Sequence, residues 1–177
     1  MYLSRSELAA FDLLSSAAKC RCILTLVRAF VEIDREIISE YEVPVLYESG
    51  VRYEFQKAVD DWKDIARCLA TMRGSCNSLT AWRVAELQLD GEIGAAPYIK
   101  SQTIAKPDGS ILDLFHVIVQ REDGSFEDPS RTLGMPPSDP SMVGARVISS
   151  ASGAIVGDAG AIFTGQLDSV GSPSWGD

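Results

Sequence analysis

The hydrophobic positions of the first forty residues recur at three- and four-residue steps, the pattern of an amphipathic helix. This pattern predicts a helix from Ser6 to Glu40, continuous or broken near Cys20, that starts at a serine cap and ends before Pro44. Its apolar positions are Leu13, Leu14, Ala17, Leu24, Val27, Phe30, Val31 and Ile37. Its acidic positions, predicted to form a solvated face, are Glu32, Asp34, Glu36 and Glu40.

Shorter elements follow this helix. The segment Val43–Phe55 is rich in β-branched and aromatic residues around a Ser49-Gly50 turn signal, which predicts two short extended pieces. Asp60–Met72 has helical spacing and is predicted to be a short helix that Gly74 closes. Ser75–Leu89 is apolar around much of its circumference, which predicts a buried helix.

Three extended runs are expected next, at Ala96–Ala105, Ile111–Arg121 and Ser125–Asp128. Turn signals separate them, Pro107-Asp108-Gly109 first and Asp123-Gly124 second. Helices followed by an antiparallel sheet predict an α+β domain.

The character of the chain changes after Gly134, where three prolines form a stiff break and the last 37 residues hold seven glycines and no lysine. The sequence therefore predicts a domain at 1–134, with a helical part at 1–42 and a core at 43–134. Residues 135–177 are predicted to be an arm, either a flexible terminus or a segment that orders against a partner.

The net charge and the cysteines reduce the number of function classes that the sequence allows. A formal net charge of -9 opposes binding to nucleic acid and to anionic lipid surfaces. The apolar stretch Cys22–Val31 contains Arg28 and is too short to span a bilayer, so neither a transmembrane helix nor a signal peptide is expected. The four cysteines are expected to be thiols, and neither a metal nor a cofactor is expected.

Cys76 is a candidate nucleophile because it falls at the start of a predicted helix. The positive end of a helix favours the thiolate, which is the nucleophilic form, and unpaired N–H groups there can hold an oxyanion. The alternative is that Cys76 is a small buried residue with no chemical role.

His116 is the single histidine of the chain, and its partner would be Asp128 at the end of the next predicted strand. A two-residue loop between the strands would turn the two side chains to opposite faces. A three-residue loop at residues 122–124, with Gly124 in the left-handed conformation, makes them diagonal neighbours on one face. We therefore predict the three-residue loop. The alternative for Asp128 is an Asp-Pro turn that ends the strand.

A cysteine at a helix start, followed by histidine and aspartate on successive antiparallel strands, is the chain order of the transglutaminase-like superfamily. Residues 40–135 resemble small transglutaminase-like, papain-type cysteine protease homologues found among phage and prophage genes. The segments that carry the resemblance are PVLYESGVRYEF (44–55), DWKDI (61–65), GSCNSLTAWRVAEL (74–87) and HVIVQREDGSFEDPSRTLGM (116–135).

The resemblance implies a papain-like half-fold, with the nucleophile helix packed on an antiparallel sheet, and a Cys76-His116-Asp128 triad that works through an acyl-enzyme. Such a protein would act on a protein or peptide substrate, by peptidase, amidase or transglutaminase-type chemistry. Trp62 is a candidate for lining the substrate site, although a tryptophan at helical spacing is more often a core residue.

The resemblance also implies synthesis in a host cytoplasm and a place in a virion, tail or phage-like particle, with the C-terminal arm on other phage structural proteins. One departure favours a different function. Family members surround the cysteine with acidic residues, whereas this chain has Ser75, Asn77 and Ser78. The alternative is therefore a weakly active or inactive structural or adaptor protein that keeps the fold as a scaffold.

Overall fold

The structure is a computed structural model that describes residues 14–55, 62–105, 111–136, 146–148 and 155–158. The chain forms two compact units. The first holds the described residues up to Ser101 together with Phe115–Met135, and the second holds those of Gln102–Leu114 and those beyond Met135. No helix of the described segments is long and apolar enough to cross a membrane.

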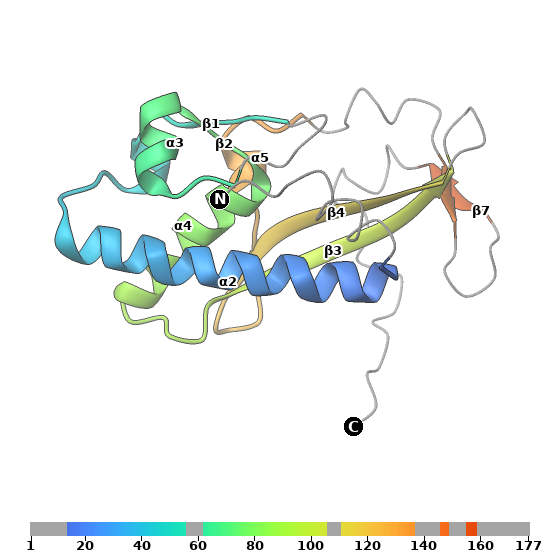
Figure 1. Cartoon of the computed structure of the whole chain (residues 1–177), viewed down its shortest axis with the longest axis horizontal. Helices are drawn as coiled ribbons and strands as arrows, with labels where there is room; N and C mark the ends of the chain where they lie inside the picture. The colour runs from blue at the N-terminus through green and yellow to red at the C-terminus, as the bar shows by residue number, and fades with distance from the viewer. Residues whose placement is uncertain (1–13, 56–61, 106–110, 137–145, 149–154, 159–177) are drawn as a thin grey trace. The chain divides into compact units, whose positions relative to one another are not determined.

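The first unit opens with helix α2, which runs unbroken from Ser16 to Glu40 (Figure 1). Ser15 caps it, because its hydroxyl accepts a hydrogen bond from the Ala18 N–H group at 3.3 Å. A break near Cys20 is thus wrong, and the predicted start at Ser6 lies outside the described residues. Asp34 is also not on a solvated face, since its side chain is fully buried.

The segment after α2 is less extended than predicted. Leu46–Glu48 forms a 3-10 helix, η1, so the first predicted extended piece is wrong, and only Arg52–Tyr53 forms a strand, β1. Strand β1 pairs in parallel with β2, Arg73–Gly74. Two hydrogen bonds hold the η1 turn: the Ser49 hydroxyl donates to the Leu46 carbonyl at 2.6 Å, and the Leu46 N–H group donates to the Glu86 side chain at 2.6 Å.

Helix α3 spans only Ile65–Thr71, so Trp62 precedes the helix and does not lie within it. Asp64 caps its start through a hydrogen bond from the Arg67 N–H group. The left-handed residue that ends the helix is Met72, with φ of 54°, and not Gly74 as expected. Helix α4, Cys76–Leu89, follows after Ser75 as predicted.

The strands agree closely with their predicted ranges: β3 at Ala96–Ala105, β4 at Ile111–Gln120 and β5 at Phe126–Glu127, followed by a short helix α5 at Pro129–Thr132. Within the first unit β5, β4 and β3 are neighbours in that order. The predicted α+β class is confirmed.

Helices α2 and α4 pack against each other (Figure 1). The core around them includes Val27 and Val31 of α2, Ala81 and Val84 of α4, and Val117 of β4. A second apolar cluster contains η1, α3 and the other side of α4, through Leu46, Ile65, Leu79 and Trp82. Because α4 contributes to both clusters, it is buried around its circumference, as its apolar pattern predicts.

In the second unit, β3 pairs antiparallel with β6, Arg146–Ile148, which pairs antiparallel with β7, Ile155–Asp158. The sequence pattern predicted no strand in this part of the chain. The other residues of the predicted C-terminal arm beyond Pro136 lie outside the described residues.

Candidate active site

Cys76 is the first residue of α4, directly after the cap residue Ser75. A close approach between two elements sets this start. A Cβ atom on Gly74 would come within 2.8 Å of the Leu79 side chain, so glycine at 74 lets β2 run directly against the first turn of α4. The Cys76 side chain is half-buried, and its Sγ lies 3.7 Å from Asn77 Oδ1.

The hairpin between β4 and β5 has the predicted three-residue loop. Val119 pairs with Glu127 and Gln120 with Phe126, and the Arg121 N–H group donates to the Ser125 carbonyl at 2.8 Å. Gly124 has φ of 83°, the left-handed conformation that such a loop needs. The register prediction is confirmed.

This register brings His116 and Asp128 together, with 2.8 Å between His116 Nε2 and Asp128 Oδ2. The other carboxylate oxygen of Asp128 accepts a hydrogen bond from the Arg131 N–H group at 3.3 Å and so caps α5. The two interpretations of Asp128 therefore hold together. The Asp-Pro turn orients the carboxylate that contacts the histidine.

The pKa values of His116 and Asp128 lie further apart than those of the free side chains. Burial lowers the pKa of His116, but hydrogen bonds with Asp128 and with the Cys76 side chain outweigh it and raise the pKa to about 9. Burial raises the pKa of Asp128, and the contact with His116 more than offsets this, so the pKa lies below its usual range. At neutral pH the pair is an imidazolium and a carboxylate. The three side chains predicted as a triad thus meet at one place.

Comparisons with protein-family models, with curated proteins and with solved structures found no match.

Trp62 lies in the loop before α3, partly buried. Its ring centroid is 5.9 Å from that of Phe30 on α2. It packs against the same core cluster as Cys76 and Phe115. Trp62 therefore packs against the core, although it does not lie on a helix as its spacing indicated.

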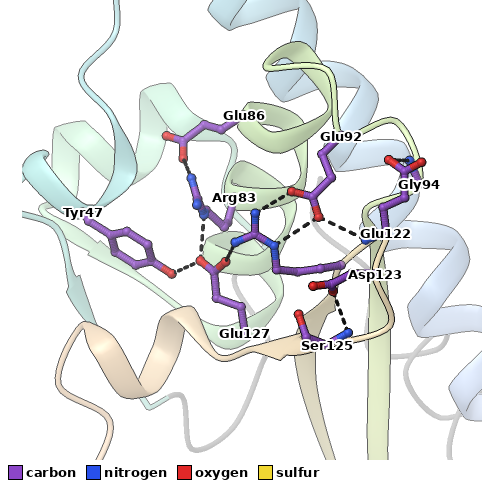
Figure 2. A network of polar contacts seen from close by, with 10 residues as sticks. Tyr47, Arg83, Glu86, Glu92, Gly94, Glu122, Asp123, Ser125 and Glu127 are labelled. Carbon is purple, nitrogen blue, oxygen red and sulfur yellow. Dashed lines mark hydrogen bonds and ion pairs between the residues drawn. The ribbon is translucent and has the colours of Figure 1, made fainter.

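A network of charged residues that the sequence analysis missed joins α4 to the histidine and aspartate strands (Figure 2). Arg83 of α4 donates to Glu127 of β5 at 2.7 Å and to Glu86 at 3.0 Å. The Tyr47 hydroxyl of η1 also bonds to Glu127. Because Glu127 precedes Asp128, this cluster fixes the position of the β5 strand against the helix that begins at Cys76.

A second arginine extends the network. Arg121, the first residue after β4, bonds to Glu127 at 3.1 Å and to both carboxylate oxygens of Glu92, which follows α4. The Glu122 N–H group donates to Glu92 as well, at 3.0 Å. The hairpin that holds His116 and Asp128 is thus tied to the end of α4 as well as to its middle.

One signal in the sequence could have found this network. Arg83 and Glu86 are the charged residues of a helix whose other residues are largely apolar, and buried charges need partners. The pKa of Glu86 reflects its burial. Burial raises its pKa, although the Leu46 N–H group at 2.6 Å and Arg83 act in the opposite direction. No cluster of histidine, cysteine and carboxylate side chains suited to a metal ion occurs within the described segments.

Proposed function

We propose that this protein is a cysteine hydrolase in which Cys76 is the nucleophile, His116 the acid and base, and Asp128 the residue that orients His116. The observation that carries the proposal is the convergence of the three side chains. His116 bonds to Asp128 at 2.8 Å and to the Cys76 side chain, from strands and a helix that are remote in the sequence. Such a geometry is the recognised requirement for a nucleophile activated by a base.

The reaction would run through an acyl-enzyme. The Cys76 sulfur forms a bond to the carbonyl carbon of an amide while the carbon–nitrogen bond breaks, and the His116 imidazolium gives its proton to the leaving amine. Water then attacks the thioester and its proton passes to His116, while the carbon–sulfur bond breaks, which releases the acid and restores the Cys76 thiolate and the His116 imidazolium. In this proposal the first-turn N–H groups of α4 would stabilise the oxyanion. An amine in place of water would give acyl transfer.

The resemblance of residues 40–135 supports the finer proposals. These are a transglutaminase-like half-fold, a protein or peptide substrate, and association with a phage or phage-like particle. The α+β order, with a cysteine that opens a helix before the antiparallel strands, is consistent with that half-fold.

A second candidate function is a structural or adaptor protein with the same fold and little activity. One observation favours it. The family's acidic residue before the cysteine is Ser75 here, and its hydroxyl oxygen is buried with no hydrogen-bond partner within the described segments. The start of α4 therefore lacks the side-chain cap hydrogen bond that an acidic residue could make there.

Competition among the cysteines separates the two functions. Cys22 is exposed, Cys20 and Cys76 are half-buried, and Cys68 is buried with its pKa raised by burial to about 12. Accessibility alone therefore predicts that a thiol probe such as iodoacetamide modifies Cys22 first. An activated thiolate predicts Cys76 first, at or below pH 7.

The experiment is a time course of iodoacetamide labelling of the folded chain, read by peptide mass spectrometry. The hydrolase proposal expects Cys76 to react at least about tenfold faster than Cys22, and His116→Ala to remove this advantage without a change at Cys22. Labelling of Cys22 ahead of Cys76 in the unmodified protein would contradict the hydrolase and support the scaffold.

A further inference from the structure

Two large aromatic side chains lie exposed on the sheet of the first unit. Tyr98 of β3 and Phe126 of β5 have ring centroids 4.9 Å apart, and their exposed fractions are 41% and 51%. The ammonium group of Lys100 lies 5.8 Å from the centre of the Phe126 ring. Exposed apolar side chains that gather at one place often mark a binding surface, whereas scattered ones do not.

The register of the hairpin relates this aromatic pair to the candidate active site. Phe126 lies opposite Gln120, and directly opposed residues share a face of the sheet. Side chains alternate along β4, so Gln120 and His116 share that face as well. Four residues at roughly 3.3 Å each separate them, so the aromatic pair lies about 13 Å along the strand from His116. An extended peptide of about four residues covers that distance.

The charge beside the rings adds a preference. The protein carries a net charge of -9, yet the cation Lys100 accompanies this patch. A carboxylate next to an apolar side chain would therefore meet a complementary charge here, while a second cation would be repelled. The patch is also small. Two half-exposed rings offer far less than the about 800 Å² per partner of a stable protein interface, which favours a single peptide side chain over a second copy of this chain.

We propose that Tyr98, Phe126 and Lys100 form a specificity subsite for a large apolar or aromatic side chain flanked by an acidic residue, in an extended peptide substrate. The subsite rests on the proposed hydrolase function and names the substrate that the same site would select.

Binding to the full-length Cys76→Ala variant tests the subsite without chemistry. The probes are fluorescein-labelled Gly-Ser peptides that carry Phe-Glu, Ala-Glu or Phe-Lys at one central position, measured by fluorescence anisotropy. We expect the Phe-Glu peptide to bind at least about tenfold more tightly than either of the others. Tyr98→Ala with Phe126→Ala should remove the preference for phenylalanine, and Lys100→Glu should invert the preference between Phe-Glu and Phe-Lys.

Tyr41→Ala is the matched control, because Tyr41 is an exposed aromatic residue, at 64%, that lies outside the patch. It should leave all three affinities unchanged. Equal affinity for the three peptides, or a preference that survives the double variant, overturns the subsite. A change in sedimentation of the double variant without an effect on peptides also overturns it and assigns the patch to self-association.

The two proposals fail in different ways. If Cys76 is labelled in the manner of an activated thiol but the peptides bind equally, the hydrolase stands and the subsite falls. If the Phe-Glu preference is found but Cys76 is not activated, the patch is a peptide-binding surface of a scaffold, and its role in substrate selection is refuted.

Discussion

Two aspartates in this protein, Asp34 fully buried and Asp128 partly buried with 27% of its side chain exposed, make similar contacts and differ in charge. Asp34 accepts a hydrogen bond from the Ile65 N–H group at 2.9 Å, and Asp128 accepts one from the Arg131 N–H group at 3.3 Å, each at the start of a short helix. Burial raises the pKa of Asp34 to about 8, whereas the pKa of Asp128 lies below its usual range despite burial, because His116 bonds to it. A cationic partner decides the charge state, and burial alone does not.

The groups around Asp34 and those around Asp128 also differ in charge. Asp34 Oδ2 is buried without a hydrogen-bond partner in the described part of the chain, and the nearby Asp64 disfavours its ionisation further. The Cys68 thiol, also affected by Asp34, is held neutral by burial. The buried acidic groups of that region, the Asp34 carboxyl and the Cys68 thiol, are therefore neutral at pH 7. The region of Asp128 keeps opposite charges together, so of the two regions only this one has the electrostatics of a reactive site.

The largest expected effect comes from replacing the two aspartates by the same residue. Asp128→Asn keeps the shape but removes the charge that stabilises the His116 imidazolium. We expect the labelling rate of Cys76 at pH 7, or peptide hydrolysis where it is measured, to fall about a hundredfold or more. Asp34→Asn replaces a carboxyl that is already neutral at pH 7 and should change the rate less than twofold. Similar losses in both variants would mean that Asp128 acts through folding alone, which circular dichroism would reveal.

The pH dependence of stability should separate the same two residues. Because the folded pKa of Asp34 is raised from 3.8 to about 8, its contribution is fully present below pH 3.8 and is lost as the pH rises through about 8. Asp128 has a lowered pKa, so its contribution is present above pH 3.8 and lost as the pH falls through that lowered value. His116 adds stability below pH 6.5 that is lost as the pH rises through about 9.

We therefore expect the free energy of unfolding in urea to fall by about 4 kcal/mol more between pH 5 and pH 9 in the unmodified protein than in Asp34→Asn. Asp128→Asn should have a lower free energy of unfolding than the unmodified protein across the same pH range, because it lacks the ion pair with His116. A slope that Asp34→Asn leaves unaltered would show that Asp34 is ionised in the folded protein.

This contrast also shows how far the sequence alone reaches. Local signals predicted α4 and the strands β3 to β5 within a few residues, and the arithmetic of the Asp123-Gly124 turn predicted the register that joins His116 to Asp128. These features depend on turn residues and on alternation, which are local properties. The same reasoning identified all three members of the proposed triad.

The failures have a common cause in contacts between distant segments. Asp34 follows the helical pattern of a solvated residue, yet it is buried and accepts a hydrogen bond from the Ile65 N–H group at the start of α3. Val43–Glu48 has strand-like composition, yet the bond between Leu46 and Glu86 holds it as a 3-10 turn against α4. Arg83 and Glu127 are 44 residues apart, and nothing near either one in the sequence names its partner. Tertiary context overrides local propensity at these places.

A smaller effect is expected from the network that ties β5 to α4. Arg83→Met should lower the free energy of unfolding by about 1 to 2 kcal/mol, because it leaves Glu86 and Glu127 without this charged partner. The labelling rate of Cys76 should fall severalfold through displacement of Asp128. Arg121→Met is the matched control, since its side chain is more exposed, at 35% against 16% for Arg83, and its loss should be the smaller of the two. If urea unfolding shows that Arg121→Met loses as much free energy of unfolding as Arg83→Met, or more, the network does not position Asp128.

The smallest effect should come from an ion pair two residues away from Asp34 on the same helix. Glu32 and Arg35 lie 3.3 Å apart, with side chains 69% and 39% exposed. Water and salt screen such a pair, so Glu32→Ala should change the free energy of unfolding by no more than about 0.5 kcal/mol, and 1 M salt should remove the difference. Urea unfolding at low and high salt measures both. A large effect at Glu32 would contradict the view that burial and partner, and not the helix that carries a carboxylate, determine its energetic role in this protein.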